Sequence, residues 1–217
     1  MVSSFWYPGG TPEEIKRREV RELLDRIKAA GKPIMAATFR LRLLTAQRGA
    51  EVHAMRWKDI DGAWWTIPAE FAKNKLSHRV PLSPQSLRVL EQVRKLTDEQ
   101  DEKAGQKRSE WVFQNPIRRE DHIYECQKLA RRVRAESKIE HRPHDFRRTA
   151  ASMMAGMGIQ RLVISKILNH IEPGVTKVYD RYSYDKEKQE ALNAWGARLA
   201  RIVSRLELVG ASDEAKG

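Results

Sequence analysis

The sequence predicts a mostly α-helical fold that also contains one small antiparallel β-sheet (α+β). Apolar residues recur at helical spacing along most of the chain, whereas residues 57–82 change to a strand-like composition between turn signals. Hydrophobic residues make up 41% and charged residues 32% of the 217 positions, a balance typical of a folded globular protein. Because no repeat or low-complexity tract interrupts the pattern, we expect one folded unit over residues 11–209, with loose ends at residues 1–10 and 210–217.

Three helices are expected first. Thr11-Pro12-Glu13-Glu14 combines an N-cap threonine, a proline at the first helical position and acidic residues in the first turn, which together indicate a helix start. The apolar spacing that follows ends at Gly31-Lys32-Pro33. Further helices are predicted over residues 34–44 and from about residue 49 to residue 55.

The sheet is expected in residues 57–82. Asp61-Gly62 is a turn signal, and residues 64–67 have strand composition that Pro68 ends. Residues 71–73 and 78–82 flank a short polar loop, so we expect these two segments to pair as a hairpin.

The second half of the chain is again helical in pattern. A helix begins at Ser83-Pro84, the highly charged residues 97–109 predict an exposed connection, and residues 111–113 predict a short buried piece. Further helices are expected over residues 124–137, 145–157 and 159–168, followed by a long C-terminal helix. In that last helix an apolar stripe steps by 3, 4, 3 and 4 residues, which suits either closure of the protein's own core or docking on a neighbouring protomer. The stripe consists of Leu192, Trp195, Leu199, Ile202 and Leu206.

Net charge and cysteine content narrow the classes of partner. Lys and Arg number 41 against 29 Asp and Glu, a formal charge of +12 that is spread along the folded body and favours a polyanionic partner. Cys126 is alone, so no intrachain disulfide and no cysteine-based zinc cluster can form. No apolar run approaches the ~20 residues of a spanning helix, and no secretory signal begins the chain. We therefore expect a cytoplasmic protein without membrane association.

Four polar motifs contain the candidate catalytic residues. In chain order they are residues 45–52, residues 73–82, residues 144–151, and Leu168-Asn169-His170 with Tyr179 nine positions after the histidine. In this order and spacing the motifs resemble the catalytic domain of the tyrosine recombinases, the phage-integrase class, over roughly residues 11–200. The ending from Tyr179 to Tyr184, followed by a helix containing Trp195, is similar to integrases of genomic islands and temperate phages.

The resemblance implies the tyrosine recombinase catalytic-domain fold and a site-specific DNA recombinase. Such an enzyme cleaves and rejoins DNA strands through a 3′-phosphotyrosine intermediate, without ATP, metal or cofactor, to integrate or excise a phage or genomic island. It further implies that the amino-terminal domain that closes around the duplex in the family is absent from this chain.

Four of the candidate residues make physical sense for phosphodiester cleavage. Arginine stays protonated and binds phosphate oxygens in a bidentate manner, so Arg48 and Arg147, brought together by folding, would clamp the scissile phosphate. Glu51 follows Arg48 by one helical turn and can orient it. His144 and Arg147 are three residues apart and therefore share one face of a helix.

The remaining roles follow from the resemblance. Tyr179 is expected to be the nucleophile, because its offset from His170 matches the family, with Tyr182 and Tyr184 as rivals. Lys73, eight residues before the proline of the predicted hairpin, is the expected general acid, with Lys75 as its competitor. The family positions of His144 and His170 assist proton transfer and phosphate binding, respectively.

The expected partner is double-stranded DNA. The resemblance implies a homotetramer on DNA, a monomer when free, and an accessory DNA-bending protein as a further candidate partner. The alternatives are a non-catalytic DNA-binding regulator with the same fold, an unrelated basic helical protein that binds RNA or an acidic partner, and a type IB topoisomerase.

Overall fold

The computed structural model describes residues 12–124, 126–137, 144–170 and 182–213, with only the backbone described in residues 12–15 and 205–213. The predicted fold class is confirmed: helices dominate, and one three-stranded antiparallel sheet has the order β1-β2-β3. The elements are α1 (Pro12–Ala29), α2 (Pro33–Thr45), α3 (Gly49–His53), the 3-10 turn η1 (Trp57–Asp59), β1 (Ile60–Asp61), β2 (Trp64–Ile67), β3 (His78–Pro81), α4 (Pro84–Lys103), α5 (Gln127–Ser137), α6 (Asp145–Gly156), α7 (Arg161–Ile167) and α9 (Asp185–Asp213).

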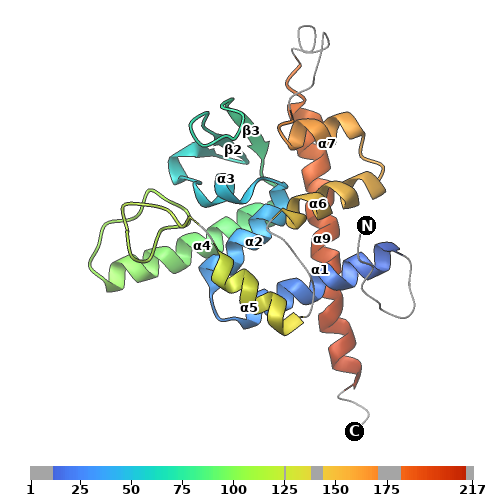
Figure 1. Ribbon diagram of the computed structural model, residues 1–217, viewed down its shortest axis with the longest axis horizontal. Coiled ribbons are helices and arrows are strands. Elements are labelled where there is room, and N and C mark those ends of the chain that lie inside the picture. The colour runs from blue at the N-terminus through green and yellow to red at the C-terminus, as the bar shows by residue number, and fades with distance from the viewer. Residues whose placement is uncertain (1–11, 125, 138–143, 171–181, 214–217) are drawn as a thin grey trace.

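The helix α2 is the centre of the fold. It begins with a proline at its first position, and most of its side chains from Ala36 to Thr45 are buried, so it is apolar on nearly every side. It contacts α1, α3, α4, α6 and α9. Figure 1 shows α2 in the middle of the molecule, with the sheet beyond α3, and the long helix α9 contacts both α2 and β3.

The hairpin differs from its prediction. The strand β2 pairs with β3, from Trp64 opposite Pro81 to Ile67 opposite His78, and residues 68–77 connect them. The expectation that residues 71–73 form a strand of the hairpin is wrong, because the carbonyl of Pro68 accepts the amides of Phe71 at 3.1 Å and Ala72 at 3.0 Å and turns the chain there. Residues 73–77 therefore lie in the connection between the two strands.

The helix α4 is longer than its charged sequence suggested. Ser83 caps its start by accepting the amide of Ser86 at 3.3 Å, and the helix continues to Lys103. The predicted exposed connection over residues 97–109 is therefore wrong in its first half. Thr97 and Asp101 are buried, and Asp101 forms an ion pair with Arg119. Because these two buried positions of α4 carry polar side chains, the apolar spacing that would have predicted a helix is interrupted there.

The long helix α9 closes the protein's own core. Leu192, Trp195, Leu199 and Ile202 are all buried, and the indole of Trp195 donates to the carbonyl of Leu43 at 2.8 Å. Of the two expectations for the apolar stripe, closure of the core is confirmed for these four residues. The side chain of Leu206 lies outside the described part, and the helix continues through residues 210–213.

Candidate active site

Arg48 and Glu51 meet at the start of α3. The Nη1 atom of Arg48 lies 2.8 Å from Oε1 of Glu51, and the backbone amide of Arg48 donates to Oε2 at 3.1 Å. Glu51 is buried, whereas the Arg48 side chain keeps 21% of its surface exposed. The carboxylate therefore holds one side of the guanidinium and leaves the other side accessible, as the three-residue spacing predicted.

Arg147, on α6, lies close to this pair but is almost completely buried. Its Nη1 donates to the carbonyl of Ala46 at 2.9 Å, and its Nη2 donates to the carbonyl of Leu168. Burial, reinforced by the positive charge of Arg48 and opposed by Glu51, lowers the pKa of Arg147 to about 10. Folding thus brings the two predicted arginines together, and Arg147 also joins the end of α2 to the end of α7.

The carboxyl end of α7 is a meeting point of distant segments. The carbonyl of Ile167 accepts two side-chain hydrogen bonds, from Nε2 of Gln47 at 2.8 Å and from Nε2 of His78 at 3.0 Å. Burial lowers the pKa of His78 to about 4, so its ring is neutral at pH 7 and carries the proton that it donates on Nε2. Since the last carbonyls of a helix have no partner within the helix, these side chains satisfy them from outside.

The connection between β2 and β3 reaches the same end of α7. The Nδ2 atom of Asn74 donates to the carbonyl of Asn169 at 3.3 Å and to its Oδ1 at 3.1 Å, and Nδ2 of Asn169 donates back to Oδ1 of Asn74 at 3.3 Å. The backbone amide of Lys73 donates to Oε1 of Glu51 at 3.4 Å. The predicted general-acid loop is therefore tied both to the partner of Arg48 and to the residue before His170.

The two candidate lysines differ in what their ammonium groups contact. Lys73 is exposed, and in the described part of the chain its ammonium makes no hydrogen bond or ion pair. Lys75 donates to the carbonyl of Glu70 at 3.3 Å and has a left-handed backbone, with φ of 57°. Lys75 therefore contacts its own loop, but both side chains are exposed, and the assignment of Lys73 as the general acid stays a prediction.

The two predicted histidines come from the start of α6 and from the segment just after α7. His144 is the N-cap residue of α6, and its pKa is lowered by partial burial and by the positive charges of Arg147, Arg148 and Arg48. His170 is exposed, and its backbone amide donates to the carbonyl of Ser165 at 3.1 Å. His144 therefore lies beside the two arginines, and His170 lies two residues after Leu168, whose carbonyl accepts from Arg147.

Tyr179 lies outside the described residues, but its two rivals lie within them. The hydroxyl of Tyr182 donates to Oε1 of Glu187 at 3.1 Å, and this bond to a carboxylate raises the pKa of the phenol. The ring of Tyr184 packs against Tyr182 with centroids 4.9 Å apart, and Nζ of Lys166 lies 5.0 Å from its centroid. Tyr182 therefore contacts α9 through Glu187, and the ring of Tyr184 contacts α7 through Lys166.

The start of α9 is anchored to the sheet. Asp185 accepts from Arg79 at 2.5 Å and from Lys188 at 2.9 Å, and the ammonium of Lys188 also donates to the carbonyl of Arg79 at 2.9 Å. The guanidinium of Arg79 lies 4.0 Å above the ring of Trp64. Asn169 and Asp185 therefore both contact the β2–β3 hairpin or its connection.

Comparison with known proteins shows the family of this chain. The model of the phage integrase family matches residues 13–186, most of the chain. The chain belongs to the phage integrase family. It is 27% identical over 184 residues to prophage integrase IntA of Escherichia coli K12 (79% of this chain, 42% of that protein). It is 26% identical over 193 residues to prophage integrase IntZ of the same organism (86% of this chain, 44% of that protein). The chain thus spans less than half the length of these relatives.

Solved structures show the fold of this integrase-family chain. XerA recombinase superimposes with a TM-score of 0.56 at 18% identity, covering 87% of this chain and 65% of XerA. A lambda integrase tetramer bound to a Holliday junction gives a TM-score of 0.54 at 15% identity, covering 77% of this chain and 47% of lambda integrase. The fold is that of the tyrosine recombinase catalytic domain.

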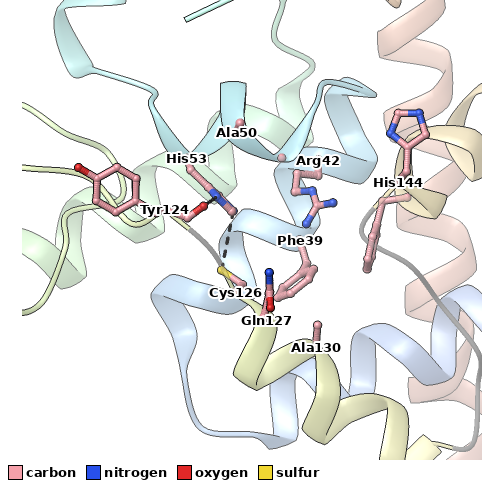
Figure 2. A pocket seen from close by; sticks show the side chains of 11 residues that line it. Phe39, Arg42, Ala50, His53, Tyr124, Cys126, Gln127, Ala130 and His144 are labelled. Carbon is pink, nitrogen blue, oxygen red and sulfur yellow. Dashed lines mark hydrogen bonds between the residues drawn. The ribbon is translucent and has the colours of Figure 1, made fainter. Parts of the chain in front are cut away.

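A pocket of about 260 Å³ adjoins the cluster in this integrase-family chain, lined among others by Gly49, Ala50 and His144. Figure 2 shows His53 on its wall, with Nδ1 3.1 Å from the carbonyl of Tyr124 and Nε2 3.8 Å from Sγ of Cys126.

Within the described residues no three His, Cys, Asp or Glu side chains are grouped so that they could bind a metal ion. In the same part of the chain, no helix has the length and apolar character to cross a bilayer.

No role was predicted from the sequence for four residues that join the cluster together, namely Gln47, Asn74, His78 and Asn169. None of them carried a clear signal. Gln47 stands between Ala46 and Arg48, and His78 stands between Ser77 and Arg79, so neither interrupts an apolar run that would have marked a buried polar residue. Both are nevertheless buried, and both donate to the carbonyl of Ile167. The contact between Asn74 and Asn169 had no local signal either, because the two residues are 95 positions apart.

Proposed function

We propose that this chain is the catalytic domain of a site-specific DNA recombinase that integrates or excises a mobile element. The observation that supports it most is the convergence of Arg48, Arg147 and His144 beside the loop that carries Lys73. Fixed cations in a partly buried site stabilise charge on phosphate oxygens without reorganising during the reaction, and this is the largest requirement of phosphoryl transfer.

In the proposed reaction the two arginines bind the scissile phosphate. Arg48 presents the open side of its guanidinium, while Arg147, held by two carbonyls, contributes the remaining part of its fork and its charge. His144 and His170, at the edge of the cluster, contribute proton transfer and a donor to a non-bridging oxygen. Glu51 touches Arg48 rather than the phosphate and acts as a positioning residue.

The strand-cleavage step balances with the groups of the chain itself. The phenol oxygen of Tyr179 attacks phosphorus, and its proton passes to a neighbouring base or water. The bond between phosphorus and the 5′ oxygen breaks, and that oxygen keeps the electron pair and takes a proton from the ammonium of Lys73. The products are a 3′-phosphotyrosine and a free 5′-hydroxyl. Attack by a 5′-hydroxyl of another strand reverses the step and joins new ends.

The assembly proposed for this chain follows from its relatives. Lambda integrase has been solved as a tetramer bound to a Holliday junction, and XerH recombinase has been solved bound to its difH substrate before cleavage. We propose double-stranded DNA as the substrate of this chain, a homotetramer on DNA and a monomer in its absence. An accessory DNA-bending protein is proposed as a further partner.

Covalent capture tests the proposed function. The chain is incubated with a pool of nicked duplexes randomised on both sides of the nick, in which the short 5′-hydroxyl product diffuses away and traps the cleaved state. We expect a protein–DNA adduct that survives denaturation, and sequencing of the trapped DNA then identifies the preferred site. Tyr179→Phe should abolish the adduct while binding to the recovered site persists.

Two results would change the proposal. Loss of the adduct in Tyr182→Phe or Tyr184→Phe, with Tyr179→Phe unaffected, would move the nucleophile to that position. Sequence-selective binding by the wild-type chain without any adduct would instead support a non-catalytic DNA-binding regulator with the same fold.

A further inference from the structure

The amide pair formed by Asn74 and Asn169 joins two segments that carry different predicted catalytic groups. Asn74 follows Lys73 in the β2–β3 connection, and Asn169 precedes His170 at the end of α7. Each amide both donates and accepts: Asn74 donates to the carbonyl of Asn169 at 3.3 Å and to its Oδ1 at 3.1 Å, and Asn169 donates to Oδ1 of Asn74 at 3.3 Å. A reciprocal pair of this kind restricts both the position and the orientation of the β2–β3 connection relative to the end of α7.

The backbone at Asn169 favours this contact. Its φ of 48° is left-handed, a conformation that asparagine adopts more readily than most residues and that ends α7. The carbonyls just before it are satisfied by Gln47, His78 and Arg147 from three other parts of the fold, so the end of α7 is a rigid support. The amide pair attaches the connection between β2 and β3 to that support.

Lys73 is thereby held from both sides. Its own backbone amide donates to Oε1 of Glu51, the carboxylate that binds Arg48, at 3.4 Å. The next residue is bound to Asn169. The side chain of Lys73 itself is exposed, and within the described residues its ammonium makes no hydrogen bond or ion pair. The backbone of Lys73 is therefore positioned while the ammonium stays available.

We propose that the Asn74–Asn169 amide pair is a positioning device that places the Lys73 ammonium at the leaving 5′ oxygen. This role rests on the proposed function and deepens it. An exposed loop lysine that is free to sample many rotamers protonates a leaving group only in the fraction of time that it points there. Tying its backbone to the segment that carries His170 raises that fraction without any contact between the asparagines and DNA.

The experiment uses the full chain and two versions of the duplex recovered by covalent capture. One is the natural duplex, and the other has sulfur in place of the 5′ bridging oxygen at the cleaved phosphate. A thiolate leaves readily without a proton because a thiol has a pKa near 8.5, whereas an alkoxide needs an acid. Asn74→Ala and Asn169→Gly remove one amide each, and the glycine keeps the left-handed backbone unstrained.

We expect each variant to slow single-turnover cleavage of the natural duplex by about tenfold or more, within the range that a general acid supplies. The same variants should cleave the sulfur-containing duplex within about threefold of the wild-type rate, because that step needs no acid. The double variant should be no slower than the slower single variant, since both changes remove one interaction. Lys73→Ala should show the same contrast between the two duplexes.

Ser77→Ala is the matched control, because Ser77 is exposed in the same connection and makes no side-chain hydrogen bond within the described residues. It should cleave both duplexes at the wild-type rate. Wild-type rates for Asn74→Ala on both duplexes, or equal slowing on both, would overturn the positioning role while leaving the recombinase function in place. Failure of the wild-type chain to cleave either duplex would overturn the proposed function and this role with it.

Discussion

Glu51 is a buried carboxylate that accepts hydrogen bonds from two different segments of the chain. It is 2% exposed and accepts from the guanidinium of Arg48, the amide of Arg48 and the amide of Lys73. A buried carboxylate is stable only when donors compensate for its lost hydration. Its burial therefore makes the orientation of Arg48 and the path of the β2–β3 connection depend on one charge.

Glu51→Gln should lower the free energy of unfolding by about 1–3 kcal/mol, because the new amide group places a donor against the donors of Arg48. Glu136→Gln is the control: its ion pair with Arg132 has a length of 2.7 Å, but the two side chains are 39% and 58% exposed. That change should cost no more than about 1 kcal/mol. Urea unfolding measures both, and equal losses would show that burial at Glu51 is unimportant.

Two buried histidines make stability depend on pH. Burial lowers the pKa of both His53 and His78 from the ordinary value of 6.5 to about 4. Between these values the unfolded chain binds protons that the folded chain does not, so the stability present above pH 6.5 is lost as pH falls toward 4. His144 shifts in the same direction, since partial burial and the neighbouring arginines also lower its pKa.

The free energy of unfolding should therefore fall between pH 6.5 and 4, by up to about 1.4 kcal/mol per histidine and pH unit. Urea unfolding at pH 7.5, 5.5 and 4.5 measures this slope. The double variant His53→Gln/His78→Gln, which has no titrating group at either position, should show a clearly smaller slope above pH 4.5. An unchanged slope would mean that other groups carry the dependence.

At the scale of elements, helix ends rather than helix faces assemble the site. The end of α2, the start of α3, the start of α6 and the end of α7 all meet at the cluster, through Arg147, Gln47 and Arg48. A second junction joins α9 to the start of α4. There Gly196 faces Ser83, and a Cβ atom added to the glycine would lie 2.7 Å from Oγ of Ser83 and 2.7 Å from Oε1 of Gln85.

Gly196→Ala should destabilise the protein by about 1–3 kcal/mol, because Ser83 is a buried N-cap that cannot move away without losing its bond to Ser86. Gly156→Ala is the matched control, since Gly156 is helical and has open space around its Cα. The control should be neutral or stabilising by up to about 1 kcal/mol. Thermal unfolding of the two variants measures the contrast, and a stabilised Gly196→Ala would contradict the packing of α9 on α4.

At the scale of the whole molecule, the core and the charge have separate roles. Helix α9 packs on α2, α4, α6, α7 and β3, so the apolar stripe, expected either to close the core or to dock on a neighbouring protomer, packs into the protein's own core over Leu192–Ile202. The formal charge of +12 is distributed over the folded body. If double-stranded DNA is the partner, as proposed, charge of this kind would contact its phosphates and release counterions on binding.

Binding of the chain to a non-specific duplex should therefore weaken steeply as salt increases. The logarithm of the binding constant should fall linearly with the logarithm of the salt concentration, with a slope of about −0.9 for each phosphate neutralised. Fluorescence anisotropy with a labelled duplex at several salt concentrations measures the slope. An almost flat response would contradict a phosphate-based interface.

The sequence by itself determined the fold class, most helices and the chemical character of the cluster. Capping residues, apolar periods and the four motifs are local signals, and the helix-forming ones were correct for α1, α2, α3, α5, α6 and α7. The spacing of Arg48 and Glu51 also predicted their contact, because residues three apart on a helix are neighbours in any fold. The predicted roles of the site residues, including Tyr179, stay predictions.

Only the tertiary structure decided which distant segments meet. The pairing of β2 with β3, the bond from Arg147 to Ala46 and the pair of Asn74 with Asn169 join residues that are separated by up to about a hundred positions. Periodicity and capping describe the energy of a segment with its near neighbours, whereas these contacts depend on the path of the whole chain. The burial of Arg147, Glu51 and His78 follows from that path, and with it the strength of their electrostatic interactions.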